Sequence, residues 1–180
     1  MLFTILLFLP ILGCAAERLF FHRSGDCWDG ADTISCRDIP ASVCCQASDP
    51  WCGVVHCEGC PKGSTVAGYF QNSCQTKANG RCEITHPFSQ EGLLGCCVDL
   101  GPYDTCAGQW YPSSSMDVAT TSERKCVQPN VMTYVDHDHG VKREIHIPQG
   151  ELKRATQLLL ARDFGGLRAF ENWAHQSSDE

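Results

Sequence analysis

The chain has few of the apolar side chains from which most domains build a core. Between Cys27 and Cys126 only fifteen residues are Val, Ile, Leu, Met or Phe, whereas thirteen of the same one hundred residues are cysteine. Cysteine at this density is typical of secreted scaffolds held together by disulfides. Covalent crosslinks must therefore provide much of the stability that an apolar core provides in other proteins.

The chain also lacks the short motifs of common enzyme and cofactor sites. It contains no Gly-x-Ser-x-Gly elbow, no phosphate-binding loop, no HExxH and no Asn-x-Ser/Thr acceptor. Cys57 and Cys60 have the spacing of a redox centre or of half a zinc site. No βαβ pattern and no second ligand pair accompany them, so an ordinary disulfide role is favoured. We therefore expect no cofactor.

Positive charge is in deficit, since 14 Lys and Arg stand against 21 Asp and Glu and the net charge is −7. The acidic residues are dispersed along the chain rather than gathered in runs. This balance argues against nucleic acid or an anionic membrane as the partner.

The first sixteen residues, Met1 to Ala16, carry no charge, are strongly apolar and end in small side chains. This pattern predicts a signal peptide that is cleaved after Ala15 or Ala16. The apolar run is short for a membrane span, and no stop-transfer pattern follows it. The alternative is a bacterial lipoprotein box that ends at Cys14. We predict a secreted, extracellular protein with no stable membrane span.

The cysteines after this segment form two similar sets, each with one adjacent pair, in a body that we place at residues 17–130. An ancient duplication of units at 27–60 and 74–126 would explain the similarity, and so would chance. Neighbouring cysteines rarely bond each other, so each pair should connect to two different places. Six bridges are the maximum, their pairing cannot be deduced, and Cys57, Cys60 or Cys126 is the natural candidate for the remaining thiol. The predicted disulfide cysteines are Cys27, Cys36, Cys44, Cys45, Cys52, Cys57, Cys60, Cys74, Cys82, Cys96, Cys97, Cys106 and Cys126.

The rest of the chain, residues 131–180, contains no cysteine, and we predict that it forms a ββα tail. Strand-like runs at 131–135 and 141–147 predict a hairpin. An apolar stripe predicts a helix from about Glu151 to Asp163, which Gly165 and Gly166 should end. The predicted fold is a small disulfide-rich α+β protein, with a mainly β and loop body and a C-terminal hairpin and helix.

The connection of the predicted hairpin is rich in carboxylates and imidazoles. Metal binding or acid/base chemistry could use these groups. An extended backbone would place His137 and His139 on the same side. A polar hairpin tip is the simpler interpretation, so we predict neither a metal site nor a catalytic residue. The candidates are Asp136, His137, Asp138, His139 and His146.

Four aromatic residues of the body are candidates for ligand binding. Such side chains can stack on sugars or anchor a protein contact. They can equally cover disulfides in the interior, and for most of them the interior position is favoured. The candidates are Trp28, Trp51, Trp110 and Tyr111.

The apolar amino end, the cysteine-rich body and the two adjacent pairs resemble the small secreted cysteine-rich proteins of fungi. The segment from Ser35 to Cys45, SCRDIPASVCC, is similar to a phrase found in that class. The resemblance implies an effector that binds or interferes outside the cell, and it supplies no active residues.

A second resemblance concerns the hydrophobins, whose eight cysteines run single, pair, single, single, pair, single. Six positions here can be read in that order, but five further cysteines intervene or flank them. The region between the pairs is polar, and no long apolar loop is available to coat an interface. The matching cysteines are Cys36, Cys44, Cys45, Cys52, Cys82, Cys96, Cys97 and Cys106.

Three hypotheses follow. The first is a secreted, disulfide-stabilised, non-enzymatic protein that binds an extracellular protein or glycan, as an effector or toxin-like factor. The second is a secreted enzyme or metal-binding protein that uses the cluster at 136–139. The third is a hydrophobin-like surface coat.

Overall fold

The computed structural model describes residues 17–23, 27, 32–70, 74, 77–85, 96–99, 105–113 and 126–171. These residues form eleven strands in two sheets, followed by two short helices. The chain is mainly β, as the sequence predicts. The predicted signal segment and Trp28 lie outside the described residues.

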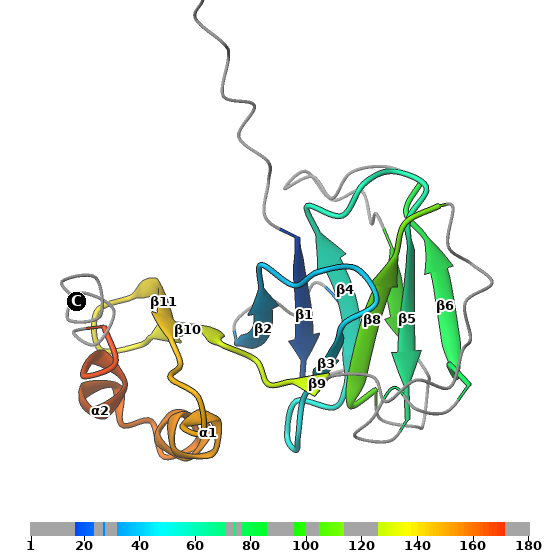
Figure 1. The fold of residues 1–180 in the computed structure, drawn as a ribbon. Coiled ribbons are helices and arrows are strands. Elements are labelled where there is room, and N and C mark those ends of the chain that lie inside the picture. The colour runs from blue at the N-terminus through cyan, green and yellow to red at the C-terminus, as the bar shows by residue number, and fades with distance from the viewer. Residues whose placement is uncertain are drawn as a thin grey trace, which may run out of the picture.

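The first sheet, which we call sheet A, has the strand order β11-β10-β2-β1-β4-β7. The second, sheet B, has the order β6-β5-β8-β3-β9. Figure 1 shows the two sheets packed side by side, with the helices beyond one edge. The strands of sheet A are β1 (Arg18–His22), β2 (Thr33–Arg37), β4 (Val54–Glu58), β7 (Cys97–Asp99), β10 (Val131–Asp136) and β11 (Val141–His146). Those of sheet B are β3 (Cys44–Gln46), β5 (Thr65–Tyr69), β6 (Gly80–Glu83), β8 (Ala107–Tyr111) and β9 (Cys126–Val127).

The first eight strands form two units of identical connectivity, β1–β4 and β5–β8. Each unit places its first, second and fourth strands in one sheet and its third strand in the other. The order β2-β1-β4-β7 in sheet A therefore has the same form as β6-β5-β8-β3 in sheet B. Every pairing inside these two sets is antiparallel. The backbone is thus unchanged in connectivity when the two units are exchanged.

Five of the six disulfides follow the same exchange, whereas Cys57–Cys60 does not, because Trp110 stands at the position equivalent to Cys57. The bridge at Cys27 corresponds to the bridge at Cys74, and the bridge at Cys36 corresponds to the one at Cys82. Each adjacent pair bonds two different partners, as the geometry requires. The repeating structural unit begins at β1 and β5, one strand before the predicted units, and its origin by duplication stays a prediction. The bridges are Cys27–Cys97, Cys36–Cys45, Cys44–Cys74, Cys52–Cys106, Cys57–Cys60 and Cys82–Cys96.

The candidates for the remaining thiol are now distinguished. Cys57 and Cys60 bond each other across a short turn. Cys126 is half-buried in β9 and lies outside the six bridges.

The core between the sheets depends on a close approach at β8. A Cβ atom at Gly108 would lie 2.9 Å from Val55 Cγ2 and 3.4 Å from the Phe21 ring. Both Val55 and Phe21 are fully buried in sheet A. Glycine is required here because any side chain would force the sheets apart.

The tail extends sheet A, because β10 pairs with β2 on one side and with β11 on the other. Met132 of β10 lies opposite Ile34 of β2, so the apolar inner face continues onto the added strands. Helices α1 (Leu152–Leu160) and α2 (Phe164–Arg168) pack on this face, and Figure 1 shows them beside β10 and β11. The Trp51 indole attaches α1 to the body by donating a hydrogen bond of 3.0 Å to Thr156.

The predicted end of the helix is wrong. Helix α1 ends at Leu160, and Gly165 and Gly166 lie inside α2. Arg162, with φ of 56°, reverses the chain between the helices instead. Gly166 serves a packing role, because a Cβ atom there would lie 2.8 Å from Leu158 Cδ2.

Candidate binding site

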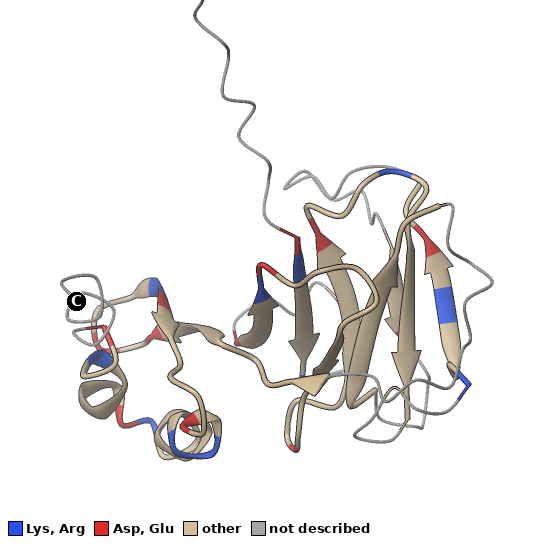
Figure 2. Ribbon diagram, in the orientation of Figure 1, with Lys and Arg blue, Asp and Glu red and all other residues tan. Residues whose placement is uncertain are grey.

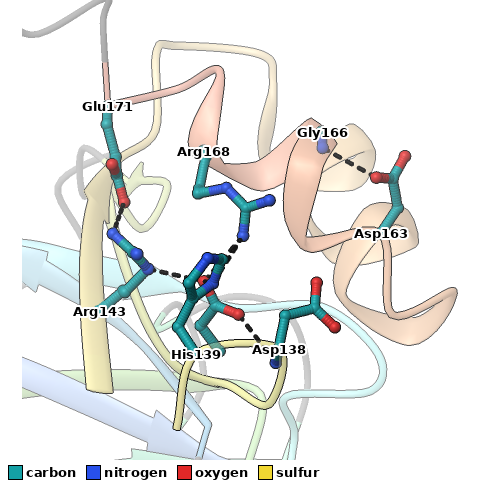
Figure 3. A network of polar contacts seen from close by, with 8 residues as sticks. Asp138, His139, Arg143, Asp163, Gly166, Arg168 and Glu171 are labelled. Carbon is teal, nitrogen blue, oxygen red and sulfur yellow. Dashed lines mark hydrogen bonds and ion pairs between the residues drawn. The ribbon is translucent and has the colours of Figure 1, made fainter. Parts of the chain in front are cut away.

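The predicted polar cluster is organised around the carboxylate of Asp136, which is fully buried. Its Oδ2 accepts hydrogen bonds of 2.8 Å from Arg143 Nε and of 2.8 Å from Arg168 Nη1. The Nδ1 atom of His139 lies 3.0 Å from the same oxygen, and the backbone N–H of Asp138 donates to Oδ1. Figure 3 shows these groups converging from β11, α2 and the connecting turn.

The protonation of Asp136 follows from these contacts. Burial opposes the charge, but the hydrogen bonds from Arg168, Arg143 and His139 outweigh it and lower the pKa of Asp136 to about 2. The bond to Asp136 in turn raises the pKa of Arg143, which also contacts Glu171 at 3.2 Å. Asp136 is therefore a permanently ionised counter-ion at neutral pH. A group in this state is poorly suited to acid/base work, and its oxygens are occupied by donors rather than offered to a metal.

The three candidate histidines do not meet. Residues 137–140 form a turn rather than extended backbone, so His139 contacts Asp136 while His137 faces the ring of Phe164, with ring centroids 5.8 Å apart. His146 pairs with Val131 at the opposite end of the β10–β11 ladder. The structure therefore brings Asp136, Asp138 and His139 together and separates them from His137 and His146.

A pocket of about 250 Å³ is lined in part by His137 of this turn. Its walls come from five parts of the chain: the segment after β1, the segment before β2, strand β10, the turn after β10, and the two helices with their connection. We call it the Arg23–Arg162 pocket. Its lining consists of Arg23, Asp32, Val135, His137, Leu159, Leu160, Arg162 and Phe164.

The two arginines are held in place by different means. The Arg23 guanidinium lies over the ring of the buried Trp51, 5.9 Å from its centroid. Arg162 has a left-handed backbone conformation that usually favours glycine, and its N–H bonds the Leu159 carbonyl at the end of α1. Within the part of the chain that the structure describes, neither guanidinium forms an ion pair.

The remaining lining gives the pocket a mixed character. Leu159 and Phe164 provide buried apolar surface, whereas Leu160 is 51% exposed at the edge. Asp32 is turned toward the backbone, where its Oδ1 accepts a 3.4 Å bond from the Val135 N–H. The pocket can therefore accept a small anionic group attached to an apolar stem.

His137 is the only lining residue of this pocket that is also a candidate site residue predicted from the sequence. Arg162 carries a weak signal, since it lies in the last turn of the amphipathic helix that the sequence predicts. Arg23 carries none, because every other lining residue except Asp32 lies more than one hundred positions away along the chain.

The predicted aromatic binding residues lie mostly in the interior. Trp51 is fully buried, and Trp110 is buried with its indole N–H donating to the Ile39 carbonyl at 2.9 Å. Tyr111 is half-buried, and its hydroxyl lies 2.9 Å from the Tyr69 hydroxyl. Neither tryptophan offers a ring face to a sugar, so we do not carry the stacking hypothesis further for these two residues.

Charged residues are few within the described strands of the body. Figure 2 shows most strands of both sheets in tan, with charged residues on β6, near the ends of β1, β2 and β4, and on β11 and the helices. Neither described helix has the length and apolar character needed to cross a lipid bilayer.

No family model, curated protein or solved structure matches the chain.

Proposed function

We infer that the chain is a secreted, disulfide-stabilised, non-enzymatic protein that binds an extracellular protein. In this proposal the Arg23–Arg162 pocket holds an acidic side chain of the partner, and Leu159, Leu160 and Phe164 contact an apolar residue beside it. An effector or toxin-like factor would use such a contact to interfere with its target. The six disulfides fit an extracellular location, where bridges persist.

The observation that carries the proposal is the convergence of Arg23 and Arg162 on one pocket. Arginine suits planar, bidentate binding of a carboxylate. Arg162 adopts its left-handed conformation at some cost in backbone energy, and residues kept in such conformations are concentrated at functional sites. The net charge of −7 opposes the approach of an acidic segment at long range, so binding in this proposal depends on the two local cations.

Two alternatives receive less support. The enzyme hypothesis needs a group that exchanges protons near neutral pH, whereas Asp136 has a pKa of about 2. The surface coat needs a broad apolar patch. The large exposed apolar residues of the described chain are Phe70, Val141 and Leu160, which lie at three separate elements.

The test uses two short peptides, acetyl-Gly-Leu-Glu-Gly-amide and its Gln analogue, which differ only in that a charged carboxylate is replaced by a neutral amide. We expect the Glu peptide to shift the NMR signals of His137 and Val135, and the Gln peptide to shift them at least about tenfold more weakly at equal concentration. Arg162→Gln should abolish the difference, whereas Arg81→Gln on β6 of the other sheet should preserve it. Equal shifts with both peptides, or none with either, would refute the pocket as an acidic-segment site.

A further inference from the structure

Two buried imidazoles lie side by side on the outer face of sheet A. His22 ends β1 and His56 lies in β4, and they are 3% and 2% exposed. Their Nε2 and Nδ1 atoms are 3.0 Å apart. Phe20 stacks on the His56 ring, with centroids 4.9 Å apart and an interplanar angle of 5°, which fixes the ring orientation.

A disulfide lies against this pair. The ligand atoms of His22, His56 and Cys27 all lie within 4.8 Å of one another. Cys27 is bonded to Cys97, and Cys97 is the residue directly opposite His56 in the β4–β7 ladder. Two imidazole nitrogens and two sulfur atoms therefore meet at one place.

The equivalent place in sheet B has different chemistry. Phe20 pairs with His56 in sheet A, as Ala67 pairs with Gln109 in sheet B. By this register Tyr69 is the counterpart of His22, and Tyr69 donates a 2.9 Å hydrogen bond to Gln109. The bridge at Cys74 is the counterpart of the bridge at Cys27. The fold thus requires only a hydrogen-bonded pair at this position, and in sheet A both members are metal-binding side chains.

We propose that reduction of the Cys27–Cys97 bridge converts this place into a zinc site with two cysteine and two histidine ligands. Two molecules of a low-molecular-weight thiol supply the electrons and are oxidised to their disulfide. Cys27 and Cys97 each gain one proton as the bridge breaks. Zinc then displaces both thiol protons to the solvent and binds the two thiolates and the two neutral imidazoles.

The geometry of the imidazoles suits a tetrahedral ion. Zn–N distances near 2.0–2.1 Å place two ligating nitrogens about 3.3 Å apart. The observed 3.0 Å therefore needs only a small opening. Two thiolates on one zinc ion lie about 3.7 Å apart, which bonded sulfur atoms cannot reach. Zinc binding by all four residues consequently depends on reduction.

The surroundings provide a supporting carboxylate and a route of access. Glu58 Oε1 lies 3.6 Å from His56 Nε2, on the side where a ligating imidazole commonly has a carboxylate partner. Cys97 is half-buried and belongs to β7, the last strand of sheet A, so a thiol can approach its sulfur from the sheet edge. This site shares no residue with the Arg23–Arg162 pocket.

The experiment treats the folded, oxidised protein with reduced glutathione, with and without zinc chloride, alkylates with iodoacetamide and maps the labelled cysteines by mass spectrometry. We expect zinc to protect Cys27 and Cys97 from labelling while Cys44 and Cys74 are labelled equally in both samples. Cobalt in place of zinc should give the visible absorption of a tetrahedral thiolate site. Equal labelling of Cys27 and Cys97 with and without zinc overturns the proposal.

Two matched variants copy one half of the molecule onto the other. His22→Tyr with His56→Gln should abolish protection, and Tyr69→His with Gln109→His should transfer it to Cys44 and Cys74. Glu58→Gln should weaken zinc binding about tenfold, and this variant remains informative if a double variant fails to fold. Protection that persists without both imidazoles would mean that zinc binds exposed thiols only, and this outcome also overturns the proposal.

Discussion

The two four-strand units share their connectivity and most of their bridges but differ in side-chain volume. Phe21 and Val55 are paired in sheet A, and the equivalent pair in sheet B is Gly68 and Gly108. The large pair occupies the space that Gly108 leaves across the core. A nearly symmetric backbone is therefore packed by unequal side chains, so neither half can be replaced by a copy of the other.

The largest effect is expected from removal of the Cys52–Cys106 bridge, which joins the segment before β4 to the segment before β8. Cys52→Ala with Cys106→Ala opens a loop of 54 residues, and we expect a loss of about 4 kcal/mol in the free energy of unfolding. Urea denaturation measures it. The matched control is Cys57→Ala with Cys60→Ala, whose span of 3 residues predicts a loss of about 1.5 kcal/mol. Equal losses would show that the Cys52 bridge does not act by joining the two units.

A smaller effect is expected when the close approach is filled. Gly108→Ala places a methyl group 2.9 Å from Val55 Cγ2 and should cost about 1–3 kcal/mol of stability. Val55→Ala in the same chain should recover part of that loss, because it removes the contacted methyl groups. A double-mutant cycle measures the coupling. Strictly additive losses would contradict the proposed complementarity of the two halves.

Strands β10 and β11, which extend sheet A, have no counterpart in sheet B. A substitution at Asp136 tests whether its ion pairs stabilise this tail. Asp136→Asn should lower the urea midpoint at neutral pH, because Arg143 and Arg168 lose their counter-ion. The pKa of Asp136 falls from 3.8 to about 2 on folding, so its contribution is present above pH 4 and is lost as the pH falls toward 2. The difference between the wild type and the variant should disappear over that interval.

The control for this prediction is Asp138→Asn. Asp138 lies in the same turn, but its side chain is exposed. We expect little change at any pH. A difference between wild type and Asp136→Asn that stays constant from pH 7 to pH 2 would show that shape rather than charge explains the effect.

The smallest expected effect is spectroscopic. Burial, together with the nearby charge of Glu171, raises the pKa of Tyr134 to about 12. An alkaline absorbance titration should show a late tyrosine ionisation that is absent in Tyr134→Phe. Glu171→Gln should move that step to lower pH. A titration in which Tyr134→Phe removes an early step would contradict the packing of Tyr134 under the helices.

The class of fold could be predicted from the sequence, but the exchange of strands could not. The sequence predicted a mainly β body, and its adjacent cysteines predicted diverging bridges. The third strands, β3 and β7, contain three residues each, and three residues show no periodicity that could assign them to a sheet. Their assignment depends on contacts between distant segments.

The candidate site was less predictable for local reasons. Alternation would pair His137 with His139, but the turn at 137–140 directs them apart. Gly165 and Gly166 suggested the end of a helix, whereas Gly166 is needed for contact with Leu158. Arg23 reaches the pocket through its position over Trp51, which only the folded chain can reveal.

The exchange of third strands also has a consequence for a shorter chain that contains only one of the two four-strand units. A polypeptide of one unit would lack the fourth position of its own sheet and would carry one strand with no sheet to join. Two identical copies could satisfy each other by trading that strand about a two-fold axis. In the present chain the turn between β4 and β5 makes the two partners one molecule, so their association no longer depends on concentration.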